Sequence, residues 1–193
     1  MLVACASIGP DDGETLLVGR MRALRPPERL LILEDLRVGM TGARDEAVRM
    51  DLDQHMGALY PFSLRQKLEA ITETSPWYSD ASASPWGRAI IPLEMVSVLA
   101  EYSGGAARFP TKGPAVGLFA DQEIRMVDGP LFVGEDYLIR REIVALSESR
   151  RTESYWVRSR IYDAAGASLK AVMLLNHATL KDSYAGYAAP AAS

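Results

Sequence analysis

The fold is decided by the stretch IIPLEMVSVLAEY, residues 90–102. Its apolar side chains recur at helical spacing and form one broad stripe: Leu93, Met95, Val96, Val98, Leu99 and Ala100. Pro92 suits the first turn of a helix, and Gly104-Gly105 can end it. Few polar groups interrupt the stripe, so we expect this helix to be the most buried one in the protein.

Four strand-like segments follow this helix. They cover residues 116–126, 137–146, 152–162 and 168–180. Gly129-Pro130 and Asp163-Ala164-Ala165-Gly166 are typical of the turns between antiparallel strands. A helix in front of four antiparallel strands predicts an α+β fold, in which the helix packs on one face of a curved sheet.

The part of the chain before this helix is predicted to hold one strand and two short helices. A strand over residues 43–50 leads to Asp51, which can cap a short helix through residue 58. Ser63 can cap a second helix, whose apolar residues share one face.

The size of the chain indicates one globular domain. It has 193 residues, of which 48% are hydrophobic and 24% are charged, and this is enough apolar material for a core. We expect an N-terminal extension over residues 1–27, a single domain over 28–183, and a disordered tail over 184–193, rich in Ala, Gly and Pro.

Composition argues against several classes of function. The formal charge is −4 and the basic residues are scattered, whereas a nucleic-acid surface needs a positive stripe. Cys5 is the only cysteine and there are two histidines, so we expect no disulfide, no metal centre and no cofactor. The apolar run at residues 1–8 is too short to span a membrane, and we expect a cytoplasmic protein.

A candidate acid/base pair precedes the helix in the stretch Glu73-Thr74-Ser75-Pro76-Trp77-Tyr78. It places a carboxylate and a phenol five residues apart. The first N–H groups of a helix have no intrahelical partner and can polarise a carbonyl group. This combination is typical of a site that acts on an acyl substrate.

The order of these features resembles the hotdog fold and, within it, the MaoC-like hydratase/dehydratase family. Members carry an Asp-x-Asn-Pro-x-His motif on a loop before the central helix, then an aromatic-Gly pair and an Ile-Ala-His/Pro stretch. Residues 73–78 match the first motif in spacing, Trp86-Gly87 takes the aromatic-Gly place, and Ile90-Ile91-Pro92 enters the helix. Residues 129–135 look like the family's Pro…Gly-Asp turn, so the resemblance covers roughly residues 34–182.

The resemblance implies water addition to, or removal from, a 2-enoyl thioester carried by coenzyme A or by an acyl-carrier protein. The family's Asp falls on Glu73, its Asn on Ser75 and its His on Tyr78. Glu73 would be the base. Tyr78 would be a hydrogen-bond donor, because a phenol has an ordinary pKa of about 10. The start of the helix would polarise the thioester carbonyl.

The same resemblance implies a substrate site at the interface of a homodimer, or of a pair with a second hotdog subunit. We expect seven residues to bind the substrate: Ser75, Trp77, Asp80, Trp86, Gly87, Pro92 and Leu93. Some of these residues can instead have a purely structural role. Asp80 can be a turn cap or can replace Glu73, and the two tryptophans can simply fill the edge of the core.

Two other functions compete with the hydro-lyase. The first is a hotdog protein that binds an acyl ligand, or supports an active partner subunit, without chemistry of its own. The second is a hotdog thioesterase, in which Glu94 or Glu101 on the central helix activates water. His55, in a polar helix, and His177, in an apolar strand, are interpreted as structural residues.

Overall fold

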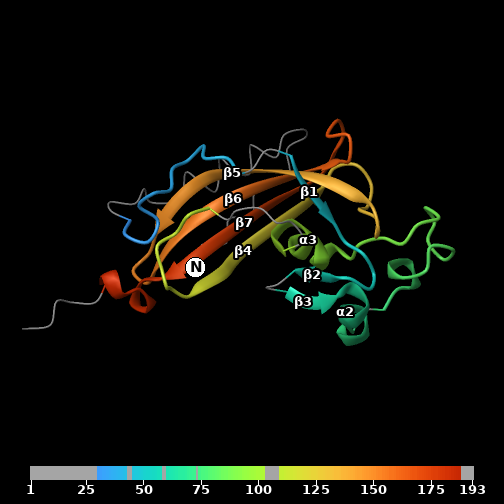
Figure 1. The fold of residues 1–193 in the computed structure, drawn as a ribbon, viewed down its shortest axis with the longest axis horizontal. Helices are drawn as coiled ribbons and strands as arrows, with labels where there is room; N and C mark the ends of the chain where they lie inside the picture. The colour runs from blue at the N-terminus through green and yellow to red at the C-terminus, as the bar shows by residue number, and fades with distance from the viewer. Residues whose placement is uncertain (1–29, 43–44, 58–59, 73, 103–108, 188–193) are drawn as a thin grey trace, which may run out of the picture.

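The structure is a computed structural model, and it describes residues 30–42, 45–57, 60–72, 74–102 and 109–187 (Figure 1). Its main layer is a five-stranded sheet with the strand order β1-β5-β6-β7-β4. The strands of this sheet are β1 (Glu46–Arg49), β4 (Gly117–Met126), β5 (Asp136–Glu148), β6 (Thr152–Asp163) and β7 (Leu169–Leu180). All its neighbouring strands are antiparallel.

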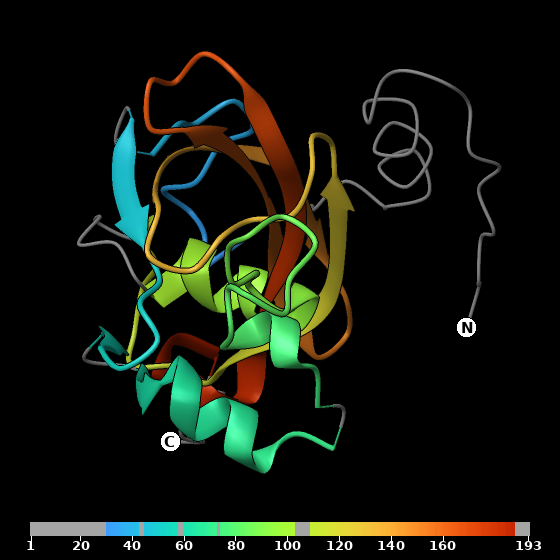
Figure 2. The ribbon, with the colours of Figure 1, turned by 90° about the vertical axis from the view of Figure 1, so that its right-hand side faces the viewer.

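A small ribbon and short helices make up the rest of the described structure. They are β2 (His55–Gly57), β3 (Tyr60–Ser63), α2 (Leu64–Ala70), α3 (Val96–Tyr102) and the 3-10 helices η1 (Pro76–Tyr78), η2 (Leu93–Met95), η3 (Lys181–Ser183) and η4 (Ala185–Tyr187). Helix α3 lies in the hollow of the curved sheet, and α2 lies beyond α3, farther from the sheet (Figure 1, Figure 2).

The central helix forms where the apolar stripe predicts it. A 3-10 turn, η2, runs directly into α3, and Pro92 stands at its start. The stripe faces the core except at Leu93, which is exposed, and Leu99 has no exposed surface. Side chains from the sheet pack against it: Val48, Tyr137, Ile139, Ile161, Ala171, Met173 and Leu175. Truncation of a leucine buried in this way typically costs about 2–5 kcal/mol of unfolding free energy.

The four long strands also form where their alternation predicts them, and every strand end lies within two residues of the predicted one. Strand β6 is central, with β5 and β7 on either side. Ile161 faces Ile139 on one neighbour and Ala171 on the other, and all three are fully buried. One face of the sheet therefore carries the apolar residues that α3 covers.

The helix expected over residues 51–58 is wrong, because this segment bends and then forms β2. Gly57 has a φ of +153°, and a Cβ built on it would lie 2.4 Å from the carbonyl oxygen of Tyr102 at the end of α3. A close approach of backbone to backbone thus fixes this segment as a ribbon, paired with β3. The helix capped by Ser63 is confirmed as α2, with Ser63 and Gln66 forming a capping box.

A second apolar cluster extends the core beyond the end of α3. Its buried members are Ile32, Leu33, Leu36, Ile143, Tyr155 and Val157. Residues 184–187, which the sequence assigns to the tail, contribute Tyr184 and Tyr187 to this cluster. The expected extension over residues 1–27 and residues 188–193 of the tail lie outside the described residues, and the single domain stays a prediction.

Candidate active site

The loop between α2 and η2 carries most of the residues predicted to form the site. Its first turn is η1, which Ser75 caps: the Ser75 hydroxyl accepts a hydrogen bond from the Trp77 N–H at 3.3 Å. Pro76 occupies the first position, where a missing N–H costs nothing. Tyr78 closes the turn, is half-buried, and donates its N–H to the Ser75 carbonyl at 3.2 Å.

A second turn in this loop repeats the same capping chemistry. The Ser84 hydroxyl accepts from the Trp86 N–H at 3.3 Å, and the Gly87 N–H donates to the Ser84 carbonyl at 3.0 Å. Gly87 has a φ of +64°, in the left-handed region that favours glycine. Glycine is therefore needed here for the backbone, whatever its part in substrate binding.

The two loop tryptophans contact each other and stay accessible. The rings of Trp77 and Trp86 meet edge to face with their centroids 5.8 Å apart. They are 40% and 46% exposed, so neither fills the edge of the core. The pair holds the two turns of the loop together and presents an aromatic surface to ligands.

Backbone hydrogen bonds join this loop to the entrance of the central helix. The Ile90 N–H donates to the Trp77 carbonyl at 2.8 Å, and the Ile91 N–H donates to the Leu131 carbonyl at 2.7 Å. Pro92 is buried, whereas Leu93 is 57% exposed. No side chain caps η2, so its first N–H groups carry the partial positive charge of a helix start without a side-chain acceptor.

Of the two carboxylates predicted as possible bases, the structure describes Asp80 but not Glu73. Glu73 lies outside the described residues, so its pairing with Tyr78 stays a prediction. The Asp80 carboxylate accepts hydrogen bonds from the Ser82 N–H at 2.8 Å and the Ser82 hydroxyl at 2.6 Å, and these bonds lower the pKa of Asp80. Asp80 is therefore a turn residue and a weak base, which favours its interpretation as a turn cap over a role in place of Glu73.

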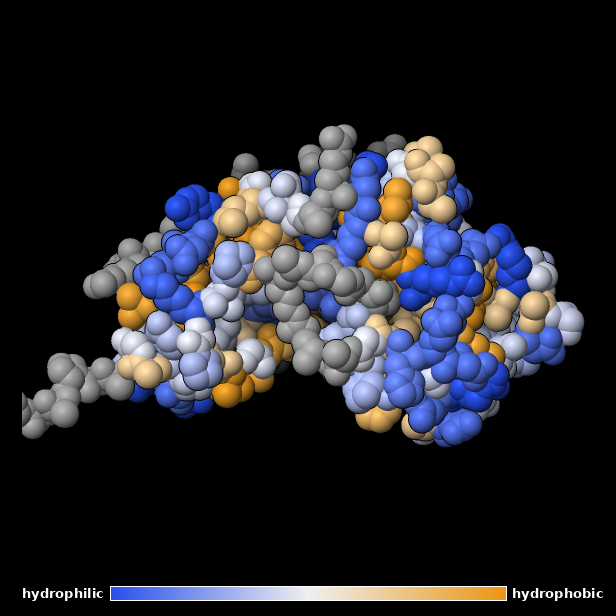
Figure 3. Space-filling view, in the orientation of Figure 1, coloured by the Kyte–Doolittle hydropathy of each residue, from blue (hydrophilic) through white to orange (hydrophobic). Residues whose placement is uncertain are grey.

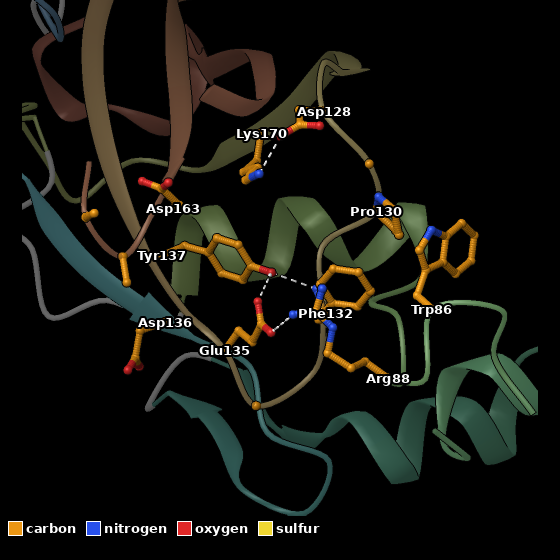
Figure 4. A pocket seen from close by; sticks show the side chains of 14 residues that line it. Trp86, Arg88, Asp128, Pro130, Phe132, Glu135, Asp136, Tyr137, Asp163 and Lys170 are labelled. Atoms are coloured by element: carbon orange, nitrogen blue, oxygen red, sulfur yellow. Dashed lines mark hydrogen bonds and ion pairs between the residues drawn. The ribbon is translucent and has the colours of Figure 1, made fainter. Parts of the chain in front are cut away.

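A groove of about 770 Å³ lies beside the loop (Figure 4). Trp86 and Arg88 of the loop form part of its wall, and Lys170 with Asp128 lies across from them. Lys170 and Asp128 form an ion pair. The groove thus combines an exposed aromatic ring with two cationic side chains and four carboxylates, those of Asp128, Glu135, Asp136 and Asp163.

Within this groove, a small polar cluster fixes the segment that follows Pro130. Arg88 pairs with Glu135, and its guanidinium lies 3.6 Å from the centroid of the Phe132 ring. The Tyr137 hydroxyl accepts from the Phe132 N–H at 2.7 Å and lies 3.5 Å from a Glu135 oxygen, to which it can donate. Burial raises the pKa of Tyr137 to about 12, so this phenol stays neutral at physiological pH.

The sequence did not single out Arg88, Tyr137 or Lys170. Arg88 directly follows Trp86-Gly87, but its partner Glu135 is 47 positions away. The sequence around Arg88 gives no sign of a contact with a residue 47 positions away. In the part of the chain that the structure describes, no group of three His, Cys, Asp or Glu side chains is placed to hold a metal ion.

The structure places the two thioesterase candidates differently. Glu94 is exposed in the first turn of η2. Glu101, at the other end of the helix, lies 3.6 Å from the His177 imidazole. His177 is thus more than the isolated strand residue expected from the sequence, and His55 lies exposed on β2 instead of in a helix.

Solved structures share this architecture. A monoamine oxidase regulatory protein from Archaeoglobus matches with a TM-score of 0.54 and 12% identity, over 81% of this chain and 97% of that chain. A MaoC-like dehydratase from Rhodospirillum rubrum matches with a TM-score of 0.51 and 16% identity, over 78% of this chain and 97% of that chain. The C-terminally truncated HadBC (3R-hydroxyacyl-ACP dehydratase) complex from Mycobacterium tuberculosis matches with a TM-score of 0.53 and 16% identity, over 73% and 96%.

This chain adopts the hotdog fold. The α+β hotdog arrangement expected from the sequence is therefore confirmed, with α3 as its central helix. No protein-family model matches the sequence, and no curated protein matches it. Among the described residues, no helix is long and apolar enough to cross a membrane.

Proposed function

We propose that this hotdog protein is a hydratase/dehydratase that adds water to, or removes it from, the 2,3 double bond of an acyl thioester. The observation that carries the proposal is the 2.8 Å hydrogen bond from the Ile90 N–H to the Trp77 carbonyl. It joins the turn that ends at Tyr78 to the uncapped start of the central helix. An acid/base loop and a carbonyl-polarising helix start belong together in this chemistry.

In the proposed hydration, the thioester carbonyl accepts hydrogen bonds from the first N–H groups of η2, at Leu93 and Glu94. Glu73 takes a proton from water as the water oxygen bonds to C3. The electron pair of the double bond moves toward the carbonyl, and Tyr78 supplies the proton that C2 gains. Dehydration is the reverse, so atoms and charge balance in both directions.

The groove of about 770 Å³ is the place we propose for the carrier end of the thioester. Trp86 offers a ring for stacking, and Arg88 and Lys170 lie on its walls, each paired with a carboxylate. Coenzyme A and the arm of an acyl-carrier protein both carry phosphate groups, and binding one here requires Arg88 or Lys170 to exchange its carboxylate partner for the phosphate. Both carriers therefore belong to the proposed substrate class.

We also propose that the protein forms a dimer, either with itself or with a second hotdog subunit. Strand β4 lies at one edge of the sheet, where it pairs only with β7. Val116, Leu118 and Phe119 are exposed at the start of this edge, and Figure 3 shows apolar surface there. The edge of a sheet presents backbone N–H and C=O groups that invite pairing with another chain.

The test is a hydration assay with short and medium 2-enoyl-CoA esters, followed by the loss of conjugated absorbance. Wild type is expected to turn over at least one chain length. Glu73→Ala and Tyr78→Phe should each be slower by about 100-fold or more, the usual size of an acid/base contribution. Glu69→Gln is the matched control, because Glu69 is an exposed carboxylate on α2.

The proposal would be overturned if the wild type hydrated none of the 2-enoyl-CoA esters. Binding of the enoyl-CoA esters without turnover would then favour the acyl-binding or partner-supporting protein. The substitution of the family's His by Tyr78 is the feature that such a result would explain, because a phenol is a poor base at neutral pH.

A further inference from the structure

A carboxylate and an imidazole meet at the end of the central helix that is far from the candidate loop. Glu101 lies in the last turn of α3, and His177 lies on β7. The Glu101 Oε2 and the His177 Nε2 are 3.6 Å apart. The side chains are 15% and 18% exposed, so the pair is largely withdrawn from water.

Aromatic rings on the neighbouring strands fix the imidazole in place. Phe119 on β4 and Tyr155 on β6 are the register partners of His177. The Tyr155 ring stacks on the imidazole, with centroids 4.8 Å apart and planes 10° apart. The Phe119 ring meets it edge to face at 5.3 Å. The orientation of His177 is thus set by a row of three rings across three strands.

This row borders a second groove, of about 750 Å³. His177 lines it, together with the rings Tyr102, Phe109, Phe119 and Tyr155 and the polar residues Thr111, Lys112 and Thr179. A groove that combines aromatic rings with polar groups is suited to a small planar ligand that also carries polar atoms. The threonine hydroxyls in the same groove can donate hydrogen bonds to a carbonyl oxygen, whereas Lys112 is paired with Glu34.

We propose that this groove is a separate hydrolytic site for esters or thioesters of aromatic acids, with His177 as the catalytic base. Glu101 is a positioning residue: its negative charge, 3.6 Å from Nε2, favours a proton on that nitrogen, which leaves Nδ1 as the accepting nitrogen, and it stabilises the imidazolium that forms. The sequence named Glu101 as a thioesterase candidate, and the structure supplies its partner and a place for the acyl group.

In this step the imidazole removes a proton from water, and the water oxygen bonds to the acyl carbon. The carbonyl oxygen becomes an oxyanion, for which the Thr111 and Thr179 hydroxyls are the donors in the groove. When the carbonyl re-forms, the carbon–sulfur or carbon–oxygen bond breaks. The imidazolium returns its proton to the leaving thiolate or alkoxide, so the products are an acid and a thiol or alcohol.

The experiment is thiol release from benzoyl-CoA, measured with a thiol reagent. His177→Gln should lower the rate by about 100-fold or more, and Glu101→Gln by a smaller factor. His55→Gln is the matched control, because His55 is the other histidine of the chain and is exposed on β2. Circular dichroism verifies that each variant is folded, and His177→Asn replaces the glutamine variant if that one is not.

The His55→Gln protein offers a readout of the positioning role, because His177 is then its only histidine and gives a single imidazole proton signal in NMR. Glu101 and Tyr102 on α3, Tyr155 on β6, and Lys112 are the titratable groups around it in the described chain. Glu101→Gln should lower the midpoint of that signal and of the pH–rate profile, and benzoate should shift the signal.

Two results would overturn this inference: no thiol release by the wild type, or equal release by folded His177→Gln. The outcome is separable from the hydration assay, because Glu73→Ala should leave thiol release unchanged and His177→Gln should leave hydration unchanged.

Discussion

At the scale of single residues, the Glu153 carboxylate on β6 does most to connect distant parts of the chain. It is fully buried and accepts N–H hydrogen bonds from Leu31 at 2.7 Å, Ile32 at 3.0 Å and Leu33 at 2.9 Å. It also accepts from the Tyr187 hydroxyl. These donors replace the water that a buried carboxylate loses, which would otherwise cost several kcal/mol.

Glu153→Gln should therefore destabilise the protein. The amide keeps one accepting oxygen but turns a donor group toward N–H groups, so about 2–4 kcal/mol of unfolding free energy should be lost. Urea denaturation measures this loss. Glu69→Gln, on the exposed face of α2, should change stability by less than about 0.5 kcal/mol. Equal stabilities of the two variants would contradict the role given to Glu153.

Tyr137 should make stability fall at alkaline pH. Its pKa is raised to about 12 in the folded protein, against about 10 in an unfolded chain. Between these values the unfolded state gives up the phenol proton and the folded state keeps it, so folding weakens as pH rises, by up to about 2–3 kcal/mol.

The comparison variant is Tyr137→Phe, measured by urea denaturation at about pH 8 and about pH 11. At the lower pH it should be less stable than wild type by about 1–3 kcal/mol, because the Phe132 N–H loses its buried acceptor. Between the lower and the higher pH, this variant should lose less unfolding free energy than the wild type does. Parallel losses in the two proteins would argue against the raised pKa.

The sequence could predict contacts between neighbouring residues, but it could not predict contacts between residues far apart in the chain. The Ser63 cap and the proposed Asp80 turn cap involve partners two or three positions away, and their local patterns are visible. Glu153 and Ile32 are 121 positions apart, and only the folded sheet brings them together. The same holds for Glu101 with His177: the sequence proposed Glu101 as a thioesterase candidate, but only the folded sheet brings His177 within 3.6 Å of it.

At the scale of elements, periodicity predicted the long ones and failed on a short one. The central helix and the four long strands each repeat their pattern over many residues, so the pattern outweighs local exceptions. Residues 51–58 contain less than three turns of a helix. There a single contact decides the structure, namely the approach of Gly57 to the carbonyl of Tyr102.

Gly57→Ala tests this explanation. The added methyl group would lie 2.4 Å from the Tyr102 carbonyl oxygen, so the β2–β3 ribbon or the end of α3 must shift. We expect a loss of about 1–3 kcal/mol in unfolding free energy. Gly117→Ala is the control, because nothing lies within 4 Å of its added Cβ. A Gly57→Ala protein as stable as this control would contradict the explanation.

At the scale of the whole molecule, the hotdog fold places the two proposed sites at the two ends of one helix. The loop with Tyr78 adjoins the start of η2, and the Glu101–His177 pair lies at the end of α3. The sequence located the first end through a motif. At the second end it pointed only to Glu101, because the ring row that includes His177 comes from three strands.

The open edge of the sheet leads to a prediction about assembly. We expect the wild type to sediment as a dimer at micromolar concentration. Leu118→Lys places a charge on the exposed edge strand β4 and should shift the protein toward monomer. A wild type that sediments as a monomer would contradict pairing through this edge.

The central claim is that the loop before the helix performs acid/base chemistry on an acyl thioester. The most direct measurement is the ratio of the hydration rates of wild type and Glu73→Ala on the best 2-enoyl-CoA ester. We predict a ratio of about 100 or more, with Glu69→Gln at the wild-type rate. A ratio near one, or no hydration by wild type, would contradict the claim.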